Sequence, residues 1–232
     1  MYFIRCIILG LVLCFFNFVF AQTKKTIQFR ISPYANGETF YPETKINLGA
    51  TEDSIKIDQL KLYISNIVFV KADKPVWKAP EQAYLWDFSD SSSNLNFLVP
   101  ASLTWESIQF NIGIDSITSV SGVFEGDLDP TQGMYWAWQS GYINIKMQGE
   151  YYSRDKGNKN FEFHLGGYQY PFNTLQKINL ACKSLRFINI GINLDSFIST
   201  INISTQSNIM SPGNDAILLS ESFAKSFYIL PE

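Results

Sequence analysis

Histidine is nearly absent from this sequence of 232 residues, which contains only one, His164. A site built from two or more imidazoles of one chain, such as an HExxH zinc site, is therefore excluded. Charged residues are also scarce, because they make up 17% of the chain against roughly 25% in an average soluble protein. The net charge of −3 offers no basic surface for the phosphates of a nucleic acid, so we expect no nucleic-acid partner.

Cysteine is scarce as well, with three residues in the whole chain. Cys6 and Cys14 lie in an apolar N-terminal run, and only Cys182 lies beyond it. If that run is removed on export, the mature protein cannot form an internal disulfide, and its stability must come from packing. We expect Cys182 to be a buried thiol that acts as a small hydrophobic side chain.

The N-terminus has the pattern of a secretory signal peptide covering residues 1–21. Arg5 precedes an apolar run over Cys6–Phe20, and Val19 and Ala21 supply small residues for cleavage after Ala21. A transmembrane anchor is disfavoured because it needs about 20 apolar residues. A lipoprotein site at Cys14 is disfavoured because leucine precedes that cysteine where a small residue is needed. We therefore expect a periplasmic or secreted protein, with the mature domain over residues 22–232.

Alternation of apolar and polar residues dominates that mature domain. The alternating segments are rich in β-branched and aromatic residues and are separated by Gly, Asn, Asp and Pro, which is typical of an antiparallel sandwich. The sequence predicts one all-β domain, a single antiparallel β-sandwich, with short helices only near Asp195–Ser199 and Ala216–Ala224. The predicted strands lie around residues 27–31, 58–70, 108–114, 143–147, 161–164 and 188–194.

The longest segment without alternation covers residues 116–140, and a loop of that length is often functional. Glu125, Asp127 and Asp129 stand at alternate positions within it, a pattern that a hard cation such as Ca²⁺ could use. However, Asp129 precedes Pro130, and Asp-Pro is a strong turn former. We therefore favour turn formation over a metal site.

Signatures of an enzyme are weak. The sequence has no GxSxG motif, and the SxxK string at Ser222–Lys225 lacks the companion motifs of penicillin-recognising enzymes. No strained elbow presents a serine to His164. We expect a protein that is not an enzyme and has no catalytic residues.

The most distinctive string covers residues 134–142 and contains Trp136 and Trp138. In an extended chain both indoles would face the same side. They could pack in the core, stack on a sugar or another planar ligand, or lie beside a metal or redox partner; core packing is the commonest role of aromatic residues. His164 alternates with two phenylalanines, so its imidazole should face away from them.

Two strings resemble the MbnP-like family, an exported copper-protein family named after a member of methanobactin operons. They are GMYWAWQSGYI at 133–143 and FEFHLGG at 161–167. LYISNI at 62–67 and FNIGID at 110–115 support the resemblance. It implies a secreted or periplasmic β-sandwich that binds copper through histidines and through a tryptophan oxidised to kynurenine. It also implies a di-haem peroxidase-like partner that makes this modification.

Carried over to this chain, the resemblance makes His164 the imidazole ligand of copper and either Trp136 or Trp138 the residue that is oxidised. Opening the indole ring creates an amine and a ketone that can bind a metal where an indole cannot. The predicted metal site therefore consists of these three residues.

The chain departs from the family where relatives often carry further histidines. Arg30 follows the first-strand Phe29, and Leu85 follows Tyr84 in a segment that is of the Tyr-His-Leu type in relatives. A copper site with two imidazoles cannot form within one chain. Either binding is weak and incomplete, or a dimer contributes, or the fold serves another role.

The alternative function is a metal-free secreted or cell-surface module that binds glycan or protein through exposed aromatic residues. Trp77, Trp86 and Trp105 are the candidates for its surface. This alternative predicts that their indoles form a contiguous exposed patch, whereas the copper hypothesis requires Trp136 or Trp138 to lie near His164.

Overall fold

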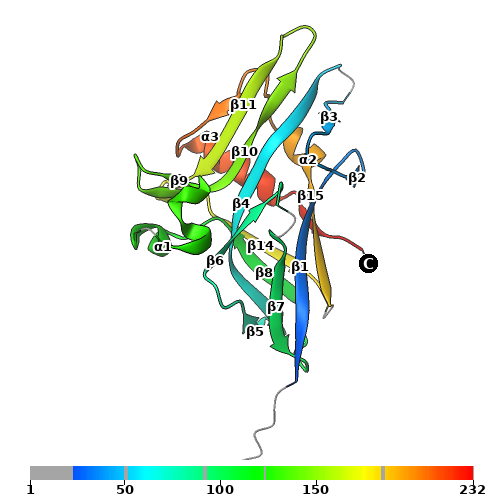
Figure 1. The fold of residues 1–232 in the computed structure, drawn as a ribbon, viewed down its shortest axis with the longest axis vertical. Coiled ribbons are helices and arrows are strands. Elements are labelled where there is room, and N and C mark those ends of the chain that lie inside the picture. Colours follow the sequence, from blue (N-terminus) through cyan, green and yellow to red (C-terminus); the bar gives the residue numbers. More distant parts are fainter. Residues whose placement is uncertain (1–22, 50–51, 91–92, 123, 184–185, 232) are drawn as a thin grey trace, which may run out of the picture.

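The computed structural model describes residues 23–49, 52–90, 93–122, 124–183 and 186–231. The predicted signal peptide lies outside these ranges. Within them, no helix combines the length and the apolar character needed to cross a bilayer. Two β-sheets account for about half of the described residues and pack against each other, which confirms the all-β prediction (Figure 1).

The larger sheet has ten strands and is built around the long strand β4 (Ser54–Lys71). β4 pairs with β8 (Ser107–Ile112) and with β10 (Gly141–Tyr152), and β10 pairs in turn with β11 (Lys159–Gly166). The remaining strands of this sheet are β3 (Lys45–Asn47), β5 (Lys74–Lys78), β6 (Ala83–Asp87), β9 (Tyr135–Trp136), β14 (Gln176–Ala181) and β16 (Asn208–Ile209).

The smaller sheet has five strands, and a separate two-stranded hairpin follows β11 in the chain. The five strands are β1 (Lys24–Ala35), β2 (Glu38–Thr39), β7 (Leu95–Pro100), β15 (Phe187–Asn193) and β17 (Phe227–Ile229). The hairpin consists of β12 (Tyr168–Gln169) and β13 (Phe172–Asn173).

The sheets are mixed, so the antiparallel part of the fold prediction needs correction. β1 pairs in parallel with β15, and β11 pairs in parallel with β16. The period of two follows from the pleat, which puts successive side chains on opposite faces in both parallel and antiparallel strands. The sequence pattern therefore identified strands without fixing their directions.

Three short α-helices accompany the sheets: α1 (Ser116–Val120), α2 (Leu194–Ile198) and α3 (Asn214–Ala224). α2 and α3 confirm the two predicted helical segments. α1 was not predicted; it begins where the carboxylate of Asp115 accepts a hydrogen bond from the Thr118 N–H at 2.7 Å. Two 3₁₀ turns, η2 (Gly126–Leu128) and η3 (Pro130–Gln132), follow in the segment expected to be irregular.

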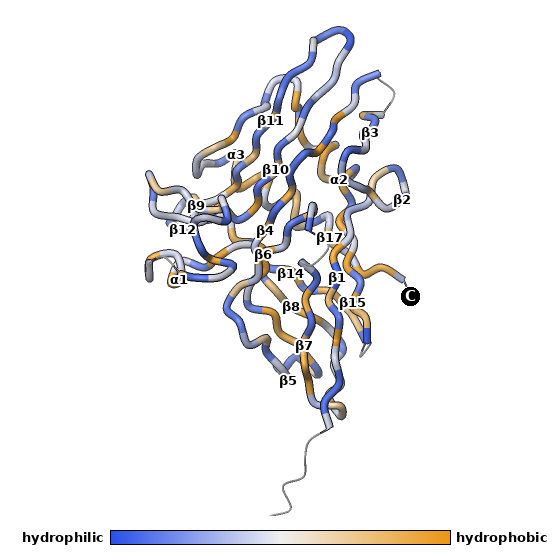
Figure 2. Tube along the Cα trace, viewed as in Figure 1, coloured by the Kyte–Doolittle hydropathy of each residue, from blue (hydrophilic) through white to orange (hydrophobic). Residues whose placement is uncertain are grey.

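The core lies between the sheets and is rich in aromatic rings. Figure 2 shows apolar and polar residues alternating along the strands that line it. The ring of Phe29 on β1 packs edge-on against that of Phe110 on β8, with 5.7 Å between centroids, and so joins the two sheets. Cys182 is buried in this core, and burial raises the pKa of its thiol, as expected for a thiol that acts as a hydrophobic side chain.

A buried amide ties the end of β8 to the β12–β13 hairpin. The Oδ1 atom of Asn144 accepts a hydrogen bond from the Ile114 N–H at 2.9 Å, and its Nδ2 donates to the Thr174 Oγ1 at 2.9 Å. Gly113 has a φ of +106°, and an ideal Cβ there would lie 2.5 Å from the Asn144 Cγ. The Asn144 side chain therefore occupies space that only glycine leaves open.

We expect Asn144→Ala to lower the free energy of unfolding by about 2 kcal/mol, because it leaves the Ile114 N–H and the Thr174 hydroxyl buried without this partner. Urea unfolding followed by circular dichroism measures the change. Asn179→Ala is the matched control, since Asn179 is exposed on β14. Equal midpoints for the two variants would contradict the assigned role of the amide.

Candidate functional site

The imidazole of His164 lies on the face of β11 that turns away from the main core. Phe161 and Phe163 belong to that core, whereas His164 points to the opposite face, as the alternation predicted. The residue is nevertheless only 7% exposed. The lone histidine is therefore a buried group, not a solvated one.

Two residues of β10 determine the state of this imidazole. The Gln148 Nε2 donates a hydrogen bond to the His164 Nε2 at 2.8 Å. Lys146 stands directly opposite His164 in the strand pairing. Burial, together with the positive charge of Lys146, lowers the pKa of His164 to about 4. The ring is therefore neutral at neutral pH.

Gln148 and Lys146 were not predicted as site residues. The signal was present, because they occupy the polar positions of the alternating segment at 143–147 and just beyond it. What the sequence did not show is that this segment pairs with the strand that carries His164. The alternation of apolar and polar residues identifies a strand, but it does not reveal which distant segment that strand pairs with.

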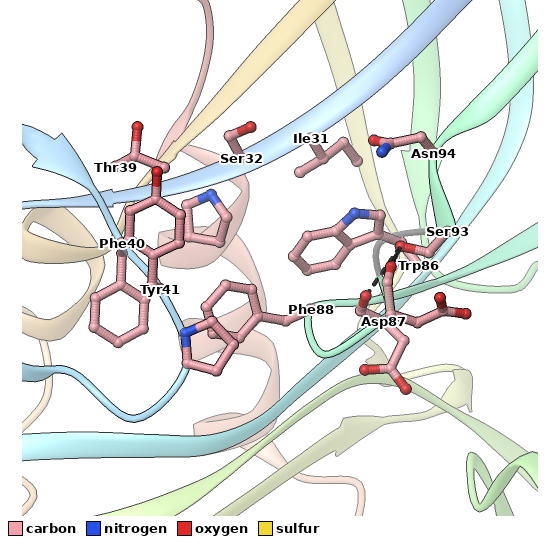
Figure 3. Close-up of a pocket in the computed structure, with 13 residues that line it drawn as sticks. Ile31, Ser32, Thr39, Phe40, Tyr41, Trp86, Asp87, Phe88, Ser93 and Asn94 are labelled. Atoms are coloured by element: carbon pink, nitrogen blue, oxygen red, sulfur yellow. Dashed lines mark hydrogen bonds between the residues drawn. The ribbon is translucent and has the colours of Figure 1, made fainter.

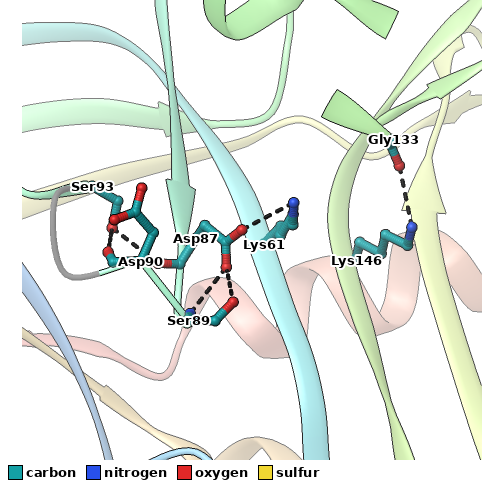
Figure 4. A network of polar contacts seen from close by, with 7 residues as sticks. All are labelled: Lys61, Asp87, Ser89, Asp90, Ser93, Gly133 and Lys146. Atoms are coloured by element: carbon teal, nitrogen blue, oxygen red, sulfur yellow. Dashed lines mark hydrogen bonds and ion pairs between the residues drawn. The ribbon is translucent and has the colours of Figure 1, made fainter. Parts of the chain in front are cut away.

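A row of charged residues leads from His164 across three further strands. His164 pairs with Lys146 on β10, Lys146 with Lys61 on β4, and Lys61 with Asp87 on β6. The Lys61 Nζ lies 2.9 Å from the Asp87 Oδ2, and the Lys146 Nζ donates to the Gly133 carbonyl at 3.2 Å (Figure 4). Burial and the neighbouring Lys61 lower the pKa of Lys146. Two lysines therefore follow the imidazole along this row, and Glu162 also acts on Lys146.

Trp136 packs on Gly166, two residues from His164 on β11. It lies on β9, is 6% exposed, and covers Gly166 of β11, where an ideal Cβ would lie 2.7 Å from the Trp136 Cζ3. Gly166 and His164 are two residues apart and so face the same side of β11, about 6.6 Å apart along the strand. One predicted tryptophan thus packs on the strand that carries the predicted imidazole, on the same face.

Trp138 lies further from the imidazole and in solvent. Its ring contacts that of Trp136, with 5.7 Å between the centroids, but 67% of the residue is exposed. The extended conformation that would have placed both indoles alike ends at Trp136, because residues 137–140 form a turn. Trp138 therefore lies on the solvent side of Trp136, which is itself buried.

The acidic segment serves as turn and anchor. The Asp129 Oδ1 accepts hydrogen bonds from the N–H and the hydroxyl of Thr131 at 2.8 and 2.7 Å, and these bonds lower the pKa of Asp129. The Asp127 Oδ2 accepts from the Leu85 N–H at 2.9 Å. The favoured turn interpretation is confirmed. In the part of the chain that the structure describes, no three His, Cys, Asp or Glu side chains gather as a metal site would require.

The exposed tryptophan patch expected for a binding module is absent from the described residues. Trp86 and Trp105 are 4% and 3% exposed, and Trp77 packs on the core ring of Phe69 at 4.8 Å between centroids. The prediction of a contiguous surface of these three indoles is wrong. Each stands in a short segment, so its sequence context did not show which face of the sheet it would take.

Trp86 instead forms one wall of a small pocket of about 180 Å³ (Figure 3). Tyr41 and Phe88 supply further aromatic walls, and Asp87 and Ser93 supply polar ones. The carboxylate of Asp87 is the one that pairs with Lys61, so this pocket stands at the far end of the charged row from His164.

Fold and site together define the class: a two-sheet β-sandwich in which one strand carries a buried imidazole and, two residues further on, the glycine on which an indole packs. The family model described as MbnP matches residues 24–211, and the chain belongs to the MbnP family. Among solved structures, MbnP from Methylosinus trichosporium is similar with a TM-score of 0.56 at 13% identity, over 78% of this chain and 80% of that one. At that identity the likeness shows the fold alone. No curated protein matches the chain.

Proposed function

We propose that this chain is an exported copper-handling protein without catalytic activity, in which His164 is the imidazole ligand and Trp136 is the oxidisable residue. The family to which it belongs is associated with copper. The observation that carries the proposal is the packing of Trp136 on Gly166, on the same face of β11 as a buried and neutral His164. A metal ion needs the neutral form of an imidazole.

The side chains present could supply part of a copper coordination shell, which fits weak binding and not a fully coordinated site. His164 is the only imidazole, and its Nε2 already accepts a hydrogen bond from Gln148. An intact indole offers no ligand for a metal, and the positive charge of Lys146 opposes a cation. When bound, copper would supply one-electron redox chemistry; the chain itself contributes a desolvated imidazole and the indole beside it.

Oxidation of a tryptophan to kynurenine would add donors that this set lacks. Trp136 is the favoured candidate because it packs on Gly166, two residues from His164 on the same face of β11. Trp138 is the alternative because its ring contacts that of Trp136 and is exposed to an external oxidant. The di-haem peroxidase-like partner belongs to this proposal, as do the periplasmic or secreted location and cleavage after Ala21.

We expect the protein purified from the periplasm after copper loading to retain copper, and His164→Gln to retain none, because that variant removes the only imidazole. Elemental analysis after gel filtration gives the ratio of copper to protein. Gln148→Ala is the informative companion variant. It removes the donor that occupies the His164 Nε2, so it should bind copper more tightly than the unmodified protein does.

Equal copper in the parent protein and in His164→Gln would overturn the metal part of the proposal. Melting curves of the three proteins establish that each is folded. Intact mass and peptide mapping of the same preparation, made in the native host, report on the indoles. Finding Trp136 and Trp138 both unmodified would remove the kynurenine part and leave the imidazole part standing.

A further inference from the structure

A second pocket, unrelated to copper, lies against the β12–β13 hairpin. It has a volume of about 190 Å³ and is formed where the hairpin meets the turn after Trp138 and the segment before α3. Tyr170 at the hairpin tip is 97% exposed, and Phe172 is 38% exposed. The lining residues are Gln139, Gly167, Tyr168, Gln169, Tyr170, Pro171, Phe172 and Pro212.

The backbone that carries these rings is fastened at several points. The Ser116 hydroxyl donates to the Tyr168 carbonyl at 2.6 Å, and the Thr174 N–H donates to the Gly167 carbonyl at 3.0 Å. The ring of Tyr168 packs on Gly141, where an ideal Cβ would lie 3.0 Å from the ring. The buried Asn144 side chain donates a hydrogen bond to the Thr174 hydroxyl, next to the hairpin. The backbone that presents these rings is therefore preformed, which lowers the entropic cost of binding.

The chemistry of the lining excludes most classes of ligand. None of the lining side chains is charged, so nothing there would compensate the charge of a phosphate, a carboxylate, an amine or a metal ion. The polar side-chain groups of the lining are all neutral: the hydroxyls of Tyr168 and Tyr170 and the amides of Gln139 and Gln169. These groups donate and accept hydrogen bonds, so the lining matches a ligand that is neutral and polar.

We propose that this pocket binds a neutral saccharide unit. A pyranose ring presents an apolar C–H face, which can stack on the exposed rings of Tyr170 and Phe172, and hydroxyl groups, which can exchange hydrogen bonds with the Tyr170 hydroxyl and the Gln169 amide. The pocket is small and open at the hairpin tip, which suits one ring of a longer neutral glycan. The proposal does not depend on copper, since none of its residues is His164, Trp136 or Trp138.

The test is an NMR titration of ¹⁵N-labelled, metal-free protein with cellobiose, lactose and N,N′-diacetylchitobiose. At least one of these should shift the amide signals of the hairpin at sugar concentrations up to ~10 mM, the weak end of specific binding. Tyr170→Ala should weaken that binding by about fivefold or more, because it removes one stacking surface. Gln169→Ala should weaken it as well, because it removes an exposed amide of the lining.

Tyr41→Ala is the matched control, because Tyr41 is also an exposed tyrosine, 63% exposed, but lines the pocket beside Trp86. It should bind the sugar like the parent protein. Since Tyr170 is almost fully exposed, its loss should leave the melting temperature unchanged.

Three outcomes would each overturn the proposal. They are the absence of any shift with the three sugars, an unaltered affinity of Tyr170→Ala, and binding of a proline-containing peptide at the same signals in place of the sugars. Repeating the titration with His164→Gln separates this result from the fate of the copper proposal.

Discussion

Gly166→Ala is expected to lower the free energy of unfolding by about 3 kcal/mol or more, the upper range for overpacking a close-packed site. The added Cβ would lie 2.6 Å from the Tyr142 carbonyl oxygen and 2.7 Å from the Trp136 Cζ3. Neither can yield easily, because the first belongs to the backbone of β10 and the second to a buried indole. The variant should therefore displace Trp136 as well as destabilise the sheet.

Urea unfolding gives the loss of stability, and the tryptophan emission of the folded variant reports the displaced indole. Gly213→Ala is the matched control, since its Cβ would meet no atom within 4 Å and its φ of 175° is extended backbone that alanine adopts freely. A second variant, Gly166→Ala with Trp136→Leu, relieves the contact with the ring and should recover part of the loss. A Gly166→Ala protein as stable as Gly213→Ala would show that Trp136 does not rest on this glycine.

The second large effect is a loss of stability between about pH 6.5 and pH 4, caused by His164. Its pKa falls from the ordinary value of 6.5 to about 4 in the folded protein. In that interval the unfolded chain takes up a proton that the folded chain does not, so stability is fully present above pH 6.5 and declines as the pH falls. A shift of this size corresponds to about 3 kcal/mol over the whole interval.

Denaturant unfolding at a series of pH values measures this decline, and His164→Gln should remove most of it. That variant keeps Lys146, Lys61 and Glu162, which share the face of the sheet, so it isolates the imidazole. The carboxylates with lowered pKa, Asp87 among them, lose their stabilising effect only at lower pH. Parallel pH profiles for the parent protein and the variant would show that the imidazole is not desolvated.

The sequence predicted the class of fold better than it predicted the connections between strands. Alternation identified β4, β8, β10 and β11, because a strand with one buried face must repeat every two residues. It could not show that β1 and β15 run in parallel, since that depends on how the chain crosses between the sheets. α1 escaped prediction because one turn of helix leaves no apolar period to recognise.

The sequence indicated two residues of the candidate site and not their surroundings. His164 and Trp136 were named from the two strings that carry the family resemblance, and the structure packs Trp136 on Gly166, two residues from His164 on the same strand. Trp138 was grouped with Trp136 because an extended chain was assumed where a turn occurs. The polar residues of β10 that control the imidazole were missed, because their role arises only through strand pairing.

The hydrogen bond from Gln148 to His164 has a consequence for the position of a single proton. An amide nitrogen can only donate, so the Nε2 of the neutral ring must carry the lone pair and Nδ1 must carry the hydrogen. One tautomer is thus selected without any metal. Because the chain has one histidine, the imidazole signals in a nitrogen spectrum belong to this ring, and its tautomer can be determined directly in the intact protein.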